Sequence, residues 1–183
     1  MLEKDLVRKK YYSIRKKKYF EIKSFFFSPF IKLIKSKYKN KKIKIAMYYP
    51  SAHELNTLRL LEINHISHQN ILLPVIEEKN VINFFTWKQN EVLLVNKYGM
   101  LEPIKSKAII PDVIMVPLLA FDKRKYRLGY GKGYYDRYLN KYLKKFKNIL
   151  TVGIAFSFQK HHKLPVSNND VKLNYILTEK GIF

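Results

Sequence analysis

The chain has 183 residues, of which 47% are apolar, so it is long enough for one domain with a buried core and too apolar for a disordered protein. The absence of cysteine excludes a disulfide scaffold and any zinc site built from thiolates, and it suits a reducing compartment. With 36 basic and 14 acidic residues the formal net charge is +22, which favours nucleic acid, a membrane surface or a polyanionic ligand as partner.

The sequence shows neither a secretion signal nor a membrane span. The N-terminus is charged from Glu3 onward, and the longest apolar runs, such as residues 113–121, are far too short to cross a bilayer. No internal repeat and no Gly/Ser linker divides the chain. We therefore expect a single domain over residues 1–183 that is cytoplasmic, does not bind membranes and is a monomer.

The first part of the chain predicts two helices, a strand and a third helix. Residues 2–22 lack Gly and Pro and form a lysine-rich helical segment. A Ser-Pro pair, typical of an N-cap followed by the first helical position, opens a second helix over 28–38. Residues 44–50 have the pattern of a buried strand that ends at a proline, and the leucines of 51–66 recur with helical periodicity.

The second part predicts five strands and one helix. The strands are expected at 71–75, 81–87, 112–117, 149–156 and 174–178, and the helix at 134–145. Strands that alternate with helices predict an α/β fold, here a single-domain three-layer α/β sandwich with a largely parallel central sheet. In such sheets ligands bind beyond the carboxyl ends of the strands.

The stretch RLGYGKGYYDRY, residues 127–138, lies between the strand at 112–117 and the helix at 134–145. It holds three of the six glycines of the chain, at alternate positions, where they would weaken a strand and a helix alike. Backbone N–H groups beside a helix N-terminus form an anion site. The side chains of Arg127 and Lys132 would add charge around a phosphate, and Asp136 could hold a magnesium ion.

The spacing of these glycines matches neither a Walker A loop nor the dinucleotide-binding fingerprint. A Walker A loop needs Ser or Thr after its lysine, and the fingerprint needs two residues before the third glycine. From the residues alone, a phosphate-binding loop and a tight crossover with a solvated arginine are equally good interpretations.

The longer segment 111–139, PDVIMVPLLAFDKRKYRLGYGKGYYDRYL, closely resembles the signature of the 5-formyltetrahydrofolate cyclo-ligases, also called 5,10-methenyltetrahydrofolate synthetases. The resemblance covers essentially the whole chain. Its other parts are Lys4-x-x-x-Arg8 and the segments 48–57, 72–75, 101–103, 153–159 and 164–174. It implies a single α/β domain that uses ATP and Mg²⁺ to convert 5-formyltetrahydrofolate to 5,10-methenyltetrahydrofolate in one-carbon metabolism, with release of ADP and phosphate.

The resemblance also implies roles for individual residues. It assigns ATP binding to Lys4, Arg8, Arg127, Leu128, Gly129, Tyr130, Gly131, Lys132, Gly133, Tyr134 and Tyr135. It assigns substrate binding to Tyr49, Glu54, Tyr130, Gly131, Lys132, Gly133 and Tyr134. The catalytic residues would be Arg127, Lys132 and Tyr134, and the magnesium ligands Asp136 and Asp170. The four-residue spacing of Lys4 and Arg8 places both on one helical face, in agreement with a shared role.

Two positions depart from the family pattern. Family members usually have glycine where Lys125 stands, and often glycine where Leu118 stands. These replacements put the shape of the turn before Arg127 in question. They do not remove any residue that is assigned to a ligand.

Two other functions explain part of the sequence. A basic nucleic-acid-binding protein would account for the net charge and the 15% aromatic content, but no helix-turn-helix, zinc-finger or RRM signature is present. An α/β enzyme that acts on another phosphorylated ligand would account for the glycine loop but not for Tyr49 and Glu54. The expected partners are therefore ATP and 5-formyltetrahydrofolate, with or without a polyglutamate tail, and no obligate nucleic acid.

Overall fold

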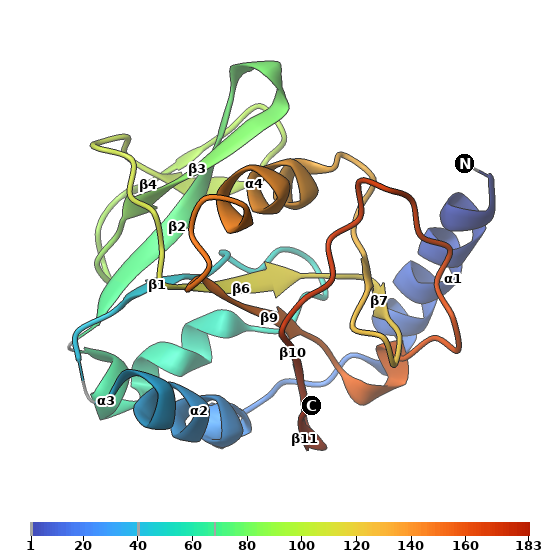
Figure 1. Ribbon diagram of the computed structural model, residues 1–183, viewed down its shortest axis with the longest axis horizontal. Helices are drawn as coiled ribbons and strands as arrows, with labels where there is room; N and C mark the ends of the chain where they lie inside the picture. Colours follow the sequence, from blue (N-terminus) through green and yellow to red (C-terminus); the bar gives the residue numbers. More distant parts are fainter. Residues whose placement is uncertain (1, 40, 68) are drawn as a thin grey trace.

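The computed structural model describes residues 2–39, 41–67 and 69–183. Its centre is a seven-stranded sheet in the order β11-β10-β9-β6-β1-β2-β3 (Figure 1). The strands are β1 (Lys44–Ala46), β2 (Asn70–Glu77), β3 (Val81–Thr86), β6 (Val113–Pro117), β9 (Leu150–Ile154), β10 (Tyr175–Thr178) and β11 (Gly181–Ile182). The five central strands are parallel, and β3 and β11 run antiparallel to their neighbours. The predicted α/β fold with a largely parallel sheet is confirmed.

Helices cover both faces of this sheet (Figure 1). α2 (Ser28–Tyr38) and the short α3 (Asn64–Ser67) lie on one face, and α4 (Tyr134–Leu143) lies on the other. Along β6, alternate side chains enter the two cores: Val113 and Met115 pack on the α2 side, whereas Ile114 and Val116 pack on the α4 side. Burial on both faces explains why this strand is a continuous apolar run.

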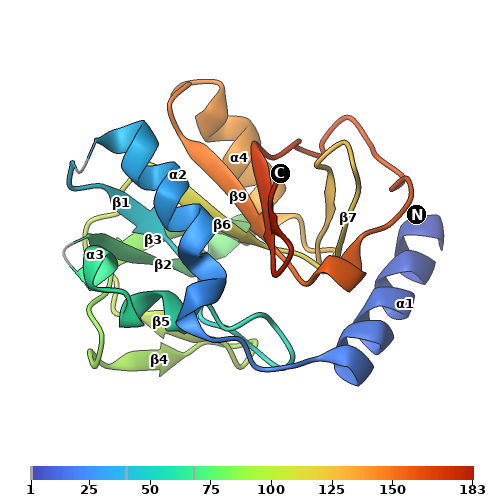
Figure 2. The same cartoon turned by 90° about the horizontal axis from the view of Figure 1, so that it is seen from below.

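α1 (Leu2–Lys18) stands at the side of the molecule, joined to the rest by a segment without regular structure (Figure 2). It packs beside the small hairpin of β7 (Ala120–Phe121) and β8 (Arg127–Leu128). The buried ring of Tyr11 makes this contact, and its hydroxyl donates to the carbonyl of Lys160 at 2.9 Å. The helix predicted over 2–22 is shorter in the structure and ends at Lys18. Beyond it, aromatic residues pack on Phe156 instead of continuing the helix.

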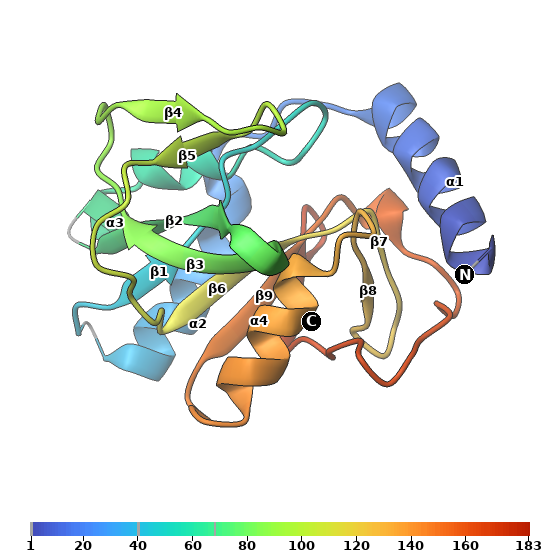
Figure 3. The same ribbon diagram turned by 90° about the horizontal axis from the view of Figure 1, so that it is seen from above.

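A second hairpin, formed by β4 (Leu93–Val95) and β5 (Leu101–Pro103), is separate from the central sheet and lies beside β2 (Figure 3). The described chain also contains four short 3₁₀ helices: η1 (Ser24–Phe27), η2 (Thr57–Glu62), η3 (Glu78–Asn80) and η4 (Ser157–Gln159). None of the helices among the described residues is long and apolar enough to cross a membrane.

The prediction of a helix over 51–66 is wrong. The structure has turns, then η2, then α3 in this range. Local side-chain bonds explain the break: the hydroxyl of Thr57 donates to the carbonyl of Tyr48 at 2.6 Å, and the side chain of Asn56 accepts from the N–H of Leu58 at 3.1 Å. The strand predicted over 44–50 is also shorter in the structure, where β1 ends at Ala46.

Candidate active site

A pocket of about 990 Å³ opens where β1 and β6 end. Its walls come from the loop after β1, the tip of the β4–β5 hairpin, the glycine-rich segment 129–133, the start of α4 and the loop at 168–170. The predicted site residues that line it are Arg8, Tyr49, Glu54, Arg127, Leu128, Gly129, Tyr130, Gly131, Lys132, Gly133, Tyr134, Tyr135, Asp136 and Asp170. Lys4 is not among the lining residues, but its ammonium is paired with Asp170.

The three glycines of the loop differ in whether the backbone requires glycine at their position. Gly131 has φ +101°, and Gly133, the N-cap of α4, has φ +68°, so both occupy backbone conformations that side chains disfavour. A Cβ on Gly133 would also lie 2.9 Å from Nη1 of Arg137. Gly129 has no left-handed φ, and a Cβ there would meet nothing within 4 Å. The fold itself therefore gives no reason for glycine at 129, which leaves room for a ligand.

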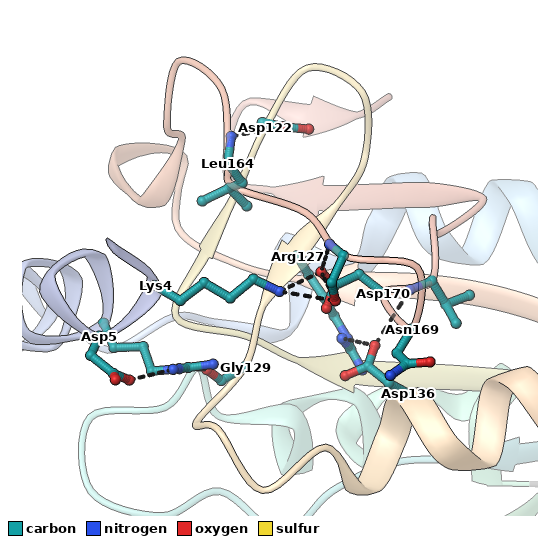
Figure 4. Close-up of polar contacts among 12 residues, drawn as sticks. Lys4, Asp5, Asp122, Arg127, Gly129, Asp136, Leu164, Asn169 and Asp170 are labelled. Carbon is teal, nitrogen blue, oxygen red and sulfur yellow. Dashed lines mark hydrogen bonds and ion pairs between the residues drawn. The ribbon is translucent and has the colours of Figure 1, made fainter. Parts of the chain in front are cut away.

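Arg8 ties the glycine loop to α1. Its Nε donates to the carbonyl of Gly129 at 3.0 Å, and its Nη1 pairs with Asp5 at 2.5 Å (Figure 4). The guanidinium also lies 3.5 Å from where a Cβ of Gly131 would be. A cationic side chain is thus held against the loop backbone, at the wall of the pocket.

Arg127 and Asp136 form the most buried ion pair of the pocket. Nη1 of Arg127 donates to Oδ1 of Asp136 at 2.9 Å, and the arginine side chain is only 3% exposed. Burial raises the pKa of the Asp136 carboxyl, and the neighbouring Arg127 charge opposes that rise. Nε of Arg127 is buried without a hydrogen-bond partner among the described residues, so this guanidinium still has a donor to offer.

Asp170 has a basic partner of its own. Lys4 of α1 reaches across to this carboxylate, as Figure 4 shows, and Ser167 donates to it through its N–H at 2.6 Å and its hydroxyl at 3.0 Å. Partial burial alone would raise the pKa of Asp170, but these hydrogen bonds outweigh it and hold the pKa below its usual value. The carboxylate therefore stays ionised at the rim of the pocket.

These two aspartates are a suitable but incomplete set of ligands for Mg²⁺. Carboxylate oxygens are the ligands that this ion prefers, and both side chains line the same pocket. Among the described residues no cluster of three or more His, Cys, Asp or Glu side chains could hold a metal alone. Asp136 and Asp170 would therefore share the ion with phosphate oxygens and water, as is usual for nucleotide-bound magnesium.

Tyr130 and Glu54 meet on the other side of the loop. The Tyr130 hydroxyl donates to Oε1 of Glu54 at 2.5 Å and accepts from Nη1 of Arg15 at 2.6 Å. Glu54 is 8% exposed, and the N–H and hydroxyl of Ser51 donate to its other oxygen at 3.0 and 3.2 Å. Burial and the Glu54 charge raise the pKa of Tyr130 far above its usual value, so the hydroxyl keeps its proton.

The remaining tyrosines give the pocket aromatic walls. Tyr134 and the half-buried Tyr49 present rings to it. The ring of Tyr135 lies 5.9 Å from the Arg127 guanidinium carbon, and its buried hydroxyl has no hydrogen-bond partner among the described residues. Lys132 is exposed in the glycine loop. Flat rings with unused polar atoms suit a planar heterocycle.

The structure accommodates both residues that depart from the family pattern. Lys125 adopts φ +67°, the left-handed conformation that glycine takes most easily, and its N–H closes a turn onto the carbonyl of Asp122 at 2.9 Å. Leu118 is 2% exposed and packs over Gly153, where a Cβ would lie 2.9 Å from it. The turn from Asp122 to Lys125 therefore has lysine at a position whose backbone conformation favours glycine.

Two groups of residues at the site were not predicted from the sequence: two that line the pocket and one that contacts a lining residue. Tyr98 and Met100 line the pocket from the tip of the β4–β5 hairpin, whose Asn-x-x-Gly turn at 96–99 was the available signal. Arg15 contacts Tyr130 from α1 but stands next to three lysines, Lys16, Lys17 and Lys18, and nothing in the sequence distinguishes it from them.

The family model described as the 5-formyltetrahydrofolate cyclo-ligase family matches residues 7–179 of this chain. The chain belongs to this family. The cyclo-ligase of Haemophilus influenzae is 32% identical over 140 residues, covering 73% of this chain and 74% of that protein. The cyclo-ligase of Escherichia coli K12 is 30% identical over 146 residues, covering 76% and 79% of the two chains.

Solved structures of two methenyltetrahydrofolate synthetases have the same fold as this cyclo-ligase. The Aquifex aeolicus protein matches with a TM-score of 0.76 and 32% identity, covering 100% of this chain and 92% of its own. The Mycoplasma pneumoniae protein matches with a TM-score of 0.68 and 26% identity, covering 96% and 98%. The match to the family model contains Arg8, the glycine loop and Asp170, whereas Lys4 lies just before it.

Proposed function

We propose that this cyclo-ligase converts 5-formyltetrahydrofolate to 5,10-methenyltetrahydrofolate in the pocket described above, using ATP and Mg²⁺ and releasing ADP and phosphate. The observation that carries the assignment is that the glycine loop, the basic side chains of Arg8, Arg127 and Lys132, and the carboxylates of Asp136 and Asp170 share one pocket with Glu54 and an aromatic wall. A phosphate-binding half and a half suited to a pterin are thus side by side, as a reaction between ATP and a folate requires.

The ATP triphosphate lies along the glycine loop. N–H groups of residues 129–133 and the start of α4 face it, and the open space beside Gly129 lets the backbone approach the phosphates closely. Lys4, Arg8, Arg127 and Lys132 supply positive charge around it. Asp136 and Asp170 would hold a magnesium ion, which would supply positive charge to neutralise the phosphate oxygens.

The folate lies between the aromatic wall and Glu54. The Glu54 carboxylate accepts hydrogen bonds from the N–H groups of the pterin, and Tyr49 and Tyr134 pack on its flat faces. Exposed lysines near the pocket favour substrates with a polyglutamate tail, through an attraction that salt screens.

The reaction needs positioning and charge neutralisation more than it needs an acid–base pair. The formyl oxygen attacks the γ-phosphorus of ATP, the bond to ADP breaks, and an iminium phosphate forms on the folate. N10 then attacks the iminium carbon and loses its proton to water, and phosphate leaves with the former formyl oxygen. Arg127 and Lys132 stabilise the negative charge on the transferring phosphoryl group, and Tyr134 orients the folate.

The protein acts in the cytoplasm, as a monomer of one domain.

A nucleic-acid-binding function would use the net charge of +22 but would leave the carboxylates of the pocket without a role. Tight, sequence-selective binding of DNA or RNA at physiological salt would favour that alternative.

An isotope experiment tests the chemistry. 5-Formyltetrahydrofolate with ¹⁸O in its formyl group is incubated with ATP, Mg²⁺ and the purified protein. We expect the label in the released inorganic phosphate, because the formyl oxygen becomes a phosphate oxygen. Label released into water, with unlabelled phosphate, would contradict this mechanism.

A further inference from the structure

Arg15 is a buried charge that the proposed mechanism leaves without a role. It is 2% exposed although it belongs to a helix whose neighbouring lysines are exposed. Its Nη1 donates to the Tyr130 hydroxyl at 2.6 Å, and its guanidinium carbon lies 5.4 Å from the centre of the Tyr130 ring. Burying an arginine costs free energy, so a structure that keeps one uses its contacts.

These contacts continue to the substrate side of the pocket. The same Tyr130 hydroxyl that accepts from Arg15 donates to Glu54 at 2.5 Å, so one oxygen joins a buried cation to a buried anion. Tyr130 is 45% exposed as a whole residue, so packing alone does not fix its side chain. Its hydroxyl contacts define its position, and with it the shape of the pocket beside Glu54.

We propose that Arg15 is a positioning residue that holds Tyr130 against Glu54 and thereby sets the binding of 5-formyltetrahydrofolate. The inference rests on the proposed function of the pocket. The charge of Arg15, acting through Tyr130, also compensates the buried Glu54 carboxylate. Without Arg15, Tyr130 loses the donor that fixes its hydroxyl beside Glu54 and is free to leave its place.

Arg15 shares one face of α1 with the residues of this helix that contact the proposed ATP side of the pocket. Lys4, Arg8, Tyr11 and Arg15 are spaced four, three and four residues apart, so they follow one face of the helix. The first two lie on the proposed ATP side, Tyr11 docks the helix, and Arg15 reaches the folate side. One helix therefore contacts both halves of the pocket.

Steady-state kinetics of the full chain test the role of Arg15. The variants are Arg15→Met, Arg15→Lys, Tyr130→Phe and the double variant Arg15→Met/Tyr130→Phe. We expect Arg15→Met and Tyr130→Phe each to raise KM for 5-formyltetrahydrofolate about tenfold, and Arg15→Met to change KM for ATP by less than about twofold. The double variant should be no worse than the worse single variant, and Arg15→Lys should recover part of the loss because its ammonium can donate to Tyr130.

Tyr11→Phe is the matched control, because it loses a hydroxyl that docks the same helix outside the pocket. It should lower Tm and leave KM for the folate unchanged. If Arg15→Met raised both KM values together, or if the two single effects added in the double variant, the inference would be wrong. Tyr130→Phe keeps the test valid if Arg15→Met does not fold. A wild type without turnover would overturn the proposed function and this inference together, whereas an active wild type with the wrong variant ratios would overturn the inference alone.

Discussion

Lys4, in the first turn of α1, is ion-paired with Asp170, in the loop before β10. The pair joins the two ends of the chain across the proposed phosphate side of the pocket. Its side chains are 21% and 17% exposed, so it is only partly screened by water. A nucleotide that brings phosphates and Mg²⁺ would compete for both partners, the phosphates for Lys4 and the metal for Asp170.

Removing the ammonium should weaken ATP binding without unfolding the protein. We expect Lys4→Met to raise the Kd for ATP in the presence of Mg²⁺ about tenfold, as measured by calorimetry. Lys9→Met is the control, because Lys9 is exposed on the same helix and does not line the pocket. Equal effects of the two variants would mean that only the overall charge of α1 matters.

The glycines of the loop should respond differently to alanine. Gly131→Ala places a side chain at φ +101° and should lower stability by about 1 kcal/mol and disturb the loop. Gly129→Ala meets no strain and no neighbour, so it should leave Tm unchanged. It should nevertheless weaken ATP binding, because its methyl group enters the space that the phosphates need. Unchanged ATP affinity in Gly129→Ala would show that the ligand does not approach this glycine.

Asp136→Asn keeps the size of the side chain and removes the charge proposed to hold Mg²⁺. Turnover should fall by orders of magnitude and recover in part as Mg²⁺ is raised. Because the buried Arg127 loses its anionic partner, the variant should also be about 1–3 kcal/mol less stable. Turnover measured across a magnesium titration decides the matter, and a magnesium dependence equal to that of the wild type would exclude Asp136 as a ligand.

Acid should weaken the protein through Asp122, which is fully buried below the turn that precedes the glycine loop. Burial alone would raise its pKa, but hydrogen bonds from Arg124 and from the N–H groups of Leu164 and Tyr126 lower it below the usual value. The native state therefore binds this proton less readily than the unfolded chain. Its contribution to stability is complete above about pH 4 and is lost as the pH falls through the lower native pKa.

Asp122→Asn tests this sign. The variant should be about 1–3 kcal/mol less stable at neutral pH, because the partly exposed Arg124 and the backbone donors lose their anion. Its urea midpoint should also change less than that of the wild type between about pH 4 and pH 2. Parallel acid profiles of the two proteins would show that other carboxyl groups control the acid sensitivity.

The sequence predicted best those features that depend on local chemistry. The apolar run at 113–117 became a central strand, α2 begins at the Ser-Pro pair, and the glycine-rich segment leads into α4. The N-cap of α2 is nevertheless Phe27, so Ser28 is the first helical residue and not the predicted cap. It failed at 51–66, where leucines with helical spacing are held by turns and a 3₁₀ helix. It also missed the two-residue strands β7 and β8, which are too short to leave a pattern.

The polar contacts of the pocket were harder to predict. Arg127 and Asp136 lie nine residues apart, and their shared role could be inferred from one motif. Lys4 and Asp170 are 166 residues apart and meet only because α1 docks beside β7. Arg15 is 115 residues from Tyr130 and lies among lysines, so only the folded structure separates it from solvated neighbours.

The proposed reaction of this pocket uses ATP and Mg²⁺ to close the 5-formyl group of the folate onto N10. The most direct measurement follows the absorbance of 5,10-methenyltetrahydrofolate in a mixture of purified protein, 5-formyltetrahydrofolate, ATP and Mg²⁺, with each component omitted in turn. We expect product only in the complete mixture, with one phosphate released for each methenyl group formed. Formation of no methenyl product, while the protein binds or hydrolyses a nucleotide with some other substrate, would contradict the account.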